Sequence, residues 1–160
     1  MSFGNLASPS SPDIEGVNTL DQYLTHKLEV LLKSHPLMGA ATNNGAFINE
    51  ITRVIQIKLY KQGDVVIKEG DPAKAMFFVI KGSIQIVSED GEFVVCEMNE
   101  GSFFGEIGIL FDANRTATVV CKTKCVLAVL KREEFQHTLA GFPEIARIIV
   151  NEAQVRYQSS

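Results

Sequence analysis

The sequence predicts a mainly β fold with flanking helices: a double-stranded β-helix, or jelly roll, with helical segments before and after it. From Val54 the apolar residues recur with a period of two, in many short runs that each end in glycine or another turn residue. Before and after this region the apolar period is that of a helix. The expected organisation is a flexible tail over 1–16, a helical segment over 17–53, a β-roll over 54–130 and C-terminal helices over 131–160.

The N-terminal part begins with residues rich in Ser, Pro, Gly and Asn, which favour a flexible chain. A long helix should follow, with Asn18 or Thr19 as its N-cap. Its apolar face consists of leucines at helical spacing: Leu20, Leu24, Leu28, Leu31 and Leu32. His35-Pro36 ends this helix, because proline disfavours helical backbone at the residue before it. A second, short helix is expected around 47–55.

Short runs of strand-forming residues make up the expected β-roll. They are 54–60, 64–70, 75–82, 83–91, 92–98, 116–122 and 125–131. Asp90-Gly91, between two alternating runs, predicts a tight hairpin. Many short, evenly spaced strands are typical of a closed or double-sheet fold. After Lys131 two helices are predicted, and the second begins at Pro143, a residue favoured at the first helical position.

Composition and charge exclude several classes of function. The 160 residues carry 15 Lys and Arg against 19 Asp and Glu, a net charge of −4. This balance argues against broad capture of nucleic acid or of an anionic membrane, but it leaves room for a small anion held by local cations. No apolar run is long enough to span a membrane, and the N-terminus lacks the basic start and apolar core of a secretory signal. We therefore expect a cytoplasmic protein without membrane insertion.

The three cysteines point to the same compartment. Cys96, Cys121 and Cys125 stand in apolar, strand-like runs and form no CxxC pair. An odd, buried set of this kind predicts free thiols in a reducing environment.

One segment, residues 101–119, departs from a plain strand pattern. Three glycines, the last two being Gly105 and Gly108, lie close together in it, although strand interiors avoid glycine unless backbone or ligand comes close. The run EIGILF suits a turn or two of helix, whose free N–H groups attract phosphate. Arg115 can grip two phosphate oxygens, and Glu106 can accept a hydrogen bond from a ribose hydroxyl. These residue types predict a site for a sugar phosphate.

Residues 104–119, FGEIGILFDANRTATV, resemble the phosphate-binding cassette of cyclic nucleotide-binding domains. The residues that match this family's pattern are Phe104, Gly105, Glu106, Gly108, Leu110, Arg115, Ala117, Thr118 and Val119. The family's upstream pattern is present in Gly63, Asp64, Val66, Gly70, Asp71, Phe78, Ile80 and Gly82. The resemblance covers about residues 47–157 and implies a β-roll that binds cAMP or cGMP.

The resemblance also implies roles for single residues. In the family the glutamate binds the ribose 2′-hydroxyl and the arginine binds the cyclic phosphate, so these roles fall to Glu106 and Arg115. The expected ligand-binding residues are Phe104, Gly105, Glu106, Ile107, Gly108, Arg115, Thr116 and Ala117. A threonine at the position of Thr116 contacts guanine in some members and also occurs in domains that prefer cAMP. Because cAMP is the commoner ligand in this family, the resemblance implies cAMP as the ligand, with cGMP a close second. Asn114 is a departure, because many members have proline before the arginine.

The same resemblance implies a helix that transmits ligand binding and an effector that responds to it. In the family the C-terminal helix closes over the base when nucleotide enters, so the helix that begins at Pro143 is the expected relay, with Tyr157 as a candidate cap for the base. A sensor needs an output, and an effector domain or partner protein is expected outside this chain.

A metal-dependent enzyme and a ligand-free scaffold are two other classes of function with a fold of this kind. Metal-dependent cupin enzymes share the jelly roll but need clustered His and carboxylate ligands on strands. His26, His35 and His137 stand in helical segments or at helix ends, far apart in the sequence. We expect no catalytic residue, no metal ligand and no cofactor other than the nucleotide. The open alternative is a degenerate cyclic nucleotide-binding fold that acts as a protein-interaction scaffold without ligand.

Overall fold

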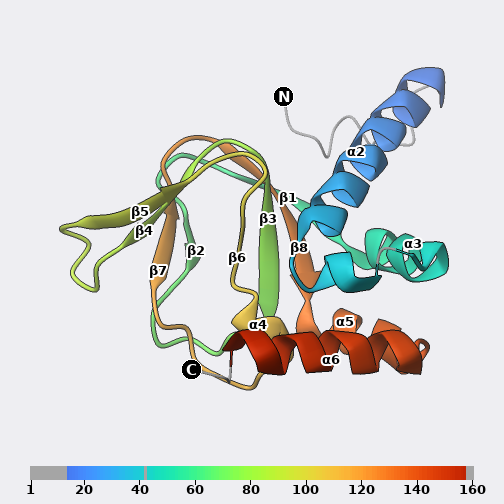
Figure 1. The fold of residues 1–160 in the computed structure, drawn as a ribbon. Coiled ribbons are helices and arrows are strands. Elements are labelled where there is room, and N and C mark those ends of the chain that lie inside the picture. The colour runs from blue at the N-terminus through green and yellow to red at the C-terminus, as the bar shows by residue number, and fades with distance from the viewer. Residues whose placement is uncertain (1–13, 42, 158–160) are drawn as a thin grey trace.

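The computed structural model of the chain describes residues 14–41 and 43–157. Two four-stranded antiparallel sheets form one side of the molecule, and most of the helices lie on the other side (Figure 1). The strand orders are β1-β8-β3-β6 and β2-β7-β4-β5. The strands are β1 Gln56–Tyr60, β2 Val65–Ile67, β3 Ala75–Lys81, β4 Ile84–Val87, β5 Val94–Met98, β6 Phe103–Phe104, β7 Thr118–Cys121 and β8 Cys125–Lys131. The predicted β-roll with flanking helices is confirmed.

β3 and its neighbour β8 are buried on both faces, and this explains why their sequences are apolar at successive positions. On one face of β3, Phe77 and Val79 belong to the apolar cluster between the two sheets. On the other face, Met76 and Phe78 belong to the cluster formed with the helices. The interior of the roll and the helical core therefore meet across these two neighbouring strands.

Three helical elements precede the roll. They are α2 Ile14–Ser34, the 3-10 turn η1 Met38–Ala41 and α3 Gly45–Val54. α2 begins before the predicted boundary, so 14–16 are helical rather than part of a flexible tail, and the rest of the predicted tail, 1–13, lies outside the described residues. The side chain of Asn44 caps α3 by accepting a hydrogen bond of 3.0 Å from the Phe47 amide.

Two helices follow the roll, and the second packs firmly on the first part of the chain. They are α5 Arg132–Ala140 and α6 Pro143–Tyr157. α6 contacts η1 and α5, and its buried row consists of Ile145, Ile149 and Ala153. Ile148 and Val155 of the same helix are 44% and 64% exposed, because they lie off this row of residues spaced by four.

α4, Ile107–Leu110, is a single turn of helix between the roll and the helical core. Ile109 is 1% exposed and belongs to the same apolar cluster as Phe78, Ile145 and Ile149. The segment 101–119 is thus connected to the C-terminal helices through one fully buried side chain.

The cysteines differ in exposure. Cys121 and Cys125 are buried free thiols, as predicted. Cys96 is exposed, contrary to the prediction, because β5 is the edge strand of its sheet. Burial, together with the neighbouring Cys125, raises the pKa of Cys121 to about 12, so the Cys121 thiol stays protonated near neutral pH.

Candidate functional site

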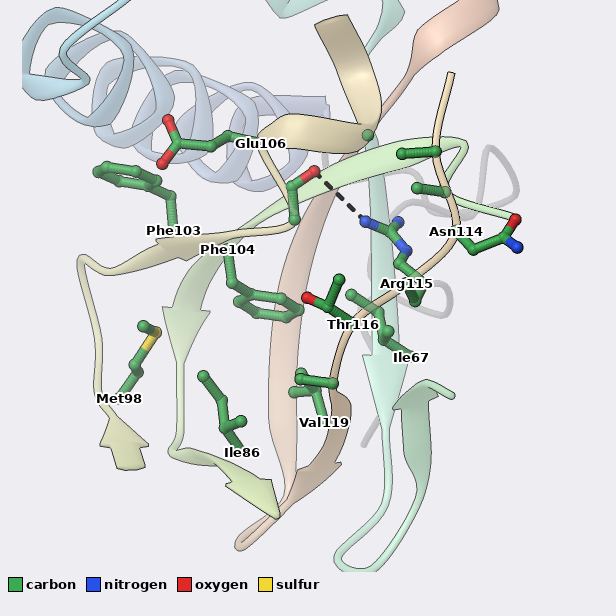
Figure 2. Close-up of a pocket in the computed structure, with 15 residues that line it drawn as sticks. Ile67, Ile86, Met98, Phe103, Phe104, Glu106, Asn114, Arg115, Thr116 and Val119 are labelled. Carbon is green, nitrogen blue, oxygen red and sulfur yellow. Dashed lines mark hydrogen bonds between the residues drawn. The ribbon is translucent and has the colours of Figure 1, made fainter. Parts of the chain in front are cut away.

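A cavity of about 320 Å³ lies between the segment 103–119 and strands β2, β4 and β5 (Figure 2). This volume falls in the range of small-molecule sites. The lining residues are Ile67, Ala73, Ile86, Met98, Phe103, Phe104, Gly105, Glu106, Gly108, Ala113, Asn114, Arg115, Thr116, Ala117 and Val119. Most of this wall is apolar, and its charged side chains are Arg115 and Glu106.

Two glycines make room for the guanidinium of Arg115. Gly105 turns the chain out of β6 with a left-handed φ of +77°, and a Cβ there would lie 3.0 Å from Arg115 Nη1 and 3.1 Å from the Ala75 oxygen. At Gly108 a Cβ would lie 2.5 Å from Ala73 Cβ and 3.0 Å from Arg115 Nη1. A Cβ at Gly108 would collide with Ala73. A Cβ at Gly105 would be strained by the left-handed φ and would crowd Arg115 and the Ala75 oxygen, so both positions favour glycine.

Backbone groups hold Arg115 in place. Its amide donates to the Asp71 oxygen at 2.7 Å, and its carbonyl accepts from the Gly70 amide at 2.8 Å. In the side chain, Nη2 donates to the Ala75 oxygen at 2.7 Å. Nη1 donates to the Gly105 oxygen at 3.4 Å, the bond drawn in Figure 2. The guanidinium is therefore fixed between β3 and the turn at Gly105.

The charge of Arg115 has no carboxylate partner within the part of the chain that the structure describes. The ion pairs found there involve other cations. Burial lowers the pKa of the half-buried Arg115, and repulsion from Arg132 lowers it further. Because arginine stays protonated in proteins, the cavity holds a positive charge that only neutral carbonyls offset among the described residues. Such a site favours an anion.

The Glu106 carboxylate points away from Arg115 (Figure 2). Its Oε2 lies 3.4 Å from Nε2 of His35, the residue that directly follows α2. The His35 side chain is fully buried, and that of Glu106 is 21% exposed. Glu106 lines the cavity, but in this conformation its carboxylate lies on the side of the helices.

The structure brings most of the predicted site residues to one cavity wall. They are Phe104, Gly105, Glu106, Gly108, Arg115, Thr116 and Ala117. Ile107 begins α4, and its side chain lies outside the described residues. Their roles toward a ligand stay predictions.

β7 begins at Thr118 rather than at 116, so Arg115, Thr116 and Ala117 precede it. In the segment before β7, Asn114 forms an isolated antiparallel bridge with Pro72, which lies between β2 and β3 of the same chain. The backbone bonds on either side of this bridge run from the Ala73 amide to the Ala113 oxygen at 2.9 Å and from the Arg115 amide to the Asp71 oxygen at 2.7 Å.

Sequence reasoning missed the apolar wall opposite Arg115 and the contact with His35. The wall residues not predicted are Ile67, Ala73, Ile86, Met98, Phe103 and Ala113. Inward-facing alternate positions on β2, β4 and β5 were the available signal for part of this wall. The contact between Glu106 and His35 has no local signal, because α2 and the cassette are far apart in the sequence.

The described residues contain no group of three or more His, Cys, Asp or Glu placed to hold a metal ion. His26 lies on α2, His35 directly after it and His137 on α5, all outside the two sheets. An arrangement of strand-borne ligands as in metal-dependent cupins is therefore not found in this part of the chain.

Comparison with known proteins agrees with the fold and the cavity. The family model for the cyclic nucleotide-binding domain matches residues 57–141, more than half of the chain. The chain belongs to the cyclic nucleotide-binding domain family. The matched range runs through the β-roll to the end of α5, so the resemblance noted in the sequence is confirmed for the family.

Relatives with this domain include much longer proteins. The potassium/sodium hyperpolarization-activated cyclic nucleotide-gated channel 2 of Mus musculus is 30% identical over 117 residues, which are 73% of this chain and 13% of the channel. The chain thus spans about an eighth of the length of that relative. None of the helices described for this chain has the length and apolar character needed to cross a bilayer.

Solved structures share the architecture. The regulatory domain of Toxoplasma gondii PKA, crystallised with cAMP, superposes with a TM-score of 0.64 at 28% identity, over 71% of this chain and 44% of that one. The N-terminal domain of a transcriptional regulator from Streptomyces coelicolor A3(2) superposes with a TM-score of 0.70 at 24% identity, over 80% of this chain and 90% of that one. The second likeness concerns the fold alone.

Gly105→Ala is expected to destabilise the domain more than Gly91→Ala. Both glycines have a φ of +77°, so both variants carry similar backbone strain, but a Cβ at Gly91 meets nothing within 4 Å. The extra loss in the free energy of unfolding should be about 1–3 kcal/mol, the usual cost of overpacking. Urea denaturation of the two variants measures it. Equal losses would mean that the turn at Gly105 adapts without disturbing Arg115.

Proposed function

We propose that this domain is a non-catalytic sensor that binds a 3′,5′-cyclic nucleotide in the cavity and passes the event to its C-terminal helices. The observation that carries the proposal is the guanidinium of Arg115 in the cavity, beside a turn with two glycines and without a carboxylate partner among the described residues. A cyclic phosphate supplies one negative charge and two oxygens, which suits the two-pronged geometry of arginine.

The remaining walls suit the other parts of a nucleotide. The apolar surface of Ile67, Ile86, Met98 and Val119 offers contacts to a purine ring. Glu106 stands beside the phosphate-binding turn, where its carboxylate can accept a hydrogen bond from a ribose hydroxyl after a side-chain rotation. α4 has only one turn, so its dipole contributes little, and we assign the phosphate to Arg115 and the backbone around Gly105.

cAMP is the proposed ligand, with cGMP second. A cAMP-dependent protein kinase regulatory subunit is among the relatives, at 30% identity, and the similar Toxoplasma gondii domain was crystallised with cAMP. Thr116 lines the cavity and is exposed, so its hydroxyl is available to either base. Calorimetric titration with both nucleotides tests the assignment, and a lack of binding to either would overturn it.

The alternative is a fold that has lost its ligand and serves as a scaffold. The orientation of Glu106 away from Arg115 favours it, since the hydroxyl acceptor is turned out of the site. The same titration distinguishes the nucleotide-binding sensor from the ligand-free scaffold. In both cases we place the output in a partner domain outside this chain and the protein in the cytoplasm.

Arg115→Ala should retain the fold and bind cAMP at least a hundredfold more weakly than the parent. Removal of the cation leaves a partly buried phosphate without its countercharge, which costs about 3 kcal/mol or more. Arg53→Ala is the matched control, because the Arg53 guanidinium is exposed on α3 and pairs with Glu50. Calorimetry measures both, and an Arg115→Ala protein that folds and binds like the parent would contradict the anchor.

Glu106→Gln should weaken the binding of cAMP. It should also reduce the loss of affinity caused by removal of the ribose 2′-hydroxyl. A hydrogen bond to a charged acceptor is worth about 1.5–3 kcal/mol, so the parent should bind 2′-deoxy-cAMP about tenfold or more weakly than cAMP. In the variant this ratio should shrink. Competition titrations with both nucleotides give the ratios, and identical ratios would remove Glu106 from the ribose site.

Nucleotide binding should increase the protection of α6 against hydrogen exchange. Ile109 of the cassette shares a buried cluster with Ile145 and Ile149, so a shift of α4 on binding alters the packing of α6. The Arg115→Ala protein at the same cAMP concentration is the control. New protection over 104–117 with none over 143–157 would show binding without a relay. The predicted cap, Tyr157, has its side chain outside the described residues.

A further inference from the structure

His35 is a fully buried histidine whose tautomer is set by the backbone. Its Nδ1 accepts hydrogen bonds from the amides of Leu37 at 3.1 Å and Met38 at 3.3 Å. A ring nitrogen that accepts carries no proton, so in the neutral ring the proton resides on Nε2. The ring also packs between Phe103, with a centroid distance of 4.2 Å, and Phe78, at 5.9 Å. These contacts fix where Nε2 points.

Nε2 points at Glu106. The separation of 3.4 Å between Nε2 and Oε2 is longer than an ideal hydrogen bond, and both atoms are shielded from solvent. Among the described residues neither Nε2 nor Oε2 makes a hydrogen bond of ordinary geometry, so each of these two buried atoms has the other as its facing polar group at 3.4 Å. The carboxylate that the cassette offers to a ribose is therefore directed, in this conformation, at the turn between α2 and η1.

We infer that His35 is a positioning residue that competes with the nucleotide for Glu106. The inference rests on the proposed function, because it concerns how the ribose site is formed. In the ligand-free state His35 Nε2 holds the carboxylate on the helical side of the cavity wall. Binding of the ribose 2′-hydroxyl requires the carboxylate to rotate toward Arg115 and to leave His35. The affinity for a ribonucleotide thus includes the cost of breaking this contact.

The competition connects ribose recognition to the N-terminal helices. Nδ1 of the same ring holds the amides that lead into η1, and η1 in turn contacts α6. When Glu106 leaves Nε2, the environment of the His35 ring changes, and this ring lies where α2, η1 and the cassette meet. The cavity therefore has a polar connection to the helical core through His35, besides the apolar one through Ile109.

The test compares His35→Asn with His35→Gln in the full chain, using cAMP and 2′-deoxy-cAMP. The amide oxygen of Asn lies near the position of Nδ1 and can keep both backbone bonds, but Asn has no group near Nε2. Gln places an N–H donor near Nε2 and serves as the conservative variant. We expect His35→Asn to bind cAMP about three- to tenfold more tightly than the parent, with 2′-deoxy-cAMP changed by less than about twofold. His35→Gln should bind both nucleotides like the parent.

Equal changes for the two nucleotides in His35→Asn would reduce His35 to a packing role and overturn the inference. Weaker binding of cAMP alone would overturn it as well, since it would mean that His35 presents Glu106 to the ribose. Absence of nucleotide binding by the parent would instead refute the proposed function, and the inference with it.

A measurement on the parent protein covers the case in which His35→Asn does not fold. The chain has three histidines, and their ring ¹⁵N resonances report the tautomer and the bonding of each nitrogen. Saturation with cAMP should shift the Nε2 signal of His35, assigned through His35→Gln, whereas 2′-deoxy-cAMP should leave it closer to its ligand-free position. The same shift with both nucleotides would contradict the competition.

Discussion

The double burial of β3 is the constraint on which the fold and the site both depend. One face of this strand supports the interior of the roll through Phe77, and the other supports the helices through Phe78. At its first residue, the Ala75 carbonyl accepts the strongest side-chain hydrogen bond of Arg115, at 2.7 Å. Phe78 also flanks the ring of His35. A displacement of β3 would therefore reach the cavity floor, the packing of the helices and the residue behind Glu106 together.

Electrostatics divides the cavity into two parts with different chemistry. At one end Arg115 has neutral carbonyls as its hydrogen-bond partners among the described residues, and burial lowers its pKa because the charged form is deprived of water. At the other end the Glu106 carboxylate is turned away from Arg115, with its Oε2 3.4 Å from His35 Nε2. The cation is thus held in place in advance, whereas the carboxylate lies on the side of the helices. Under the proposed function, the phosphate site is preorganised in this conformation and the ribose site is not.

Most of the fold could be predicted from the sequence, because a period of two and glycine-closed turns are local signals. The cassette could be predicted for a related reason: Gly105, Gly108 and Arg115 are close in sequence, and their collision distances explain the spacing. The direction of the Glu106 side chain could not, since it depends on His35, which tertiary packing alone brings near. The exposure of Cys96 was misjudged because an apolar run does not reveal that its strand lies at a sheet edge.

The uneven accessibility of the thiols has a practical consequence. Cys96 is exposed on β5, two residues from Met98 of the cavity wall and paired in the sheet with Ile86 of the same wall. Cys121 and Cys125 are buried, and the high pKa of Cys121 suppresses its thiolate. A maleimide dye would therefore attach selectively at the rim of the cavity without any engineered cysteine. The native chain already carries the attachment point for an optical reporter of cavity occupancy.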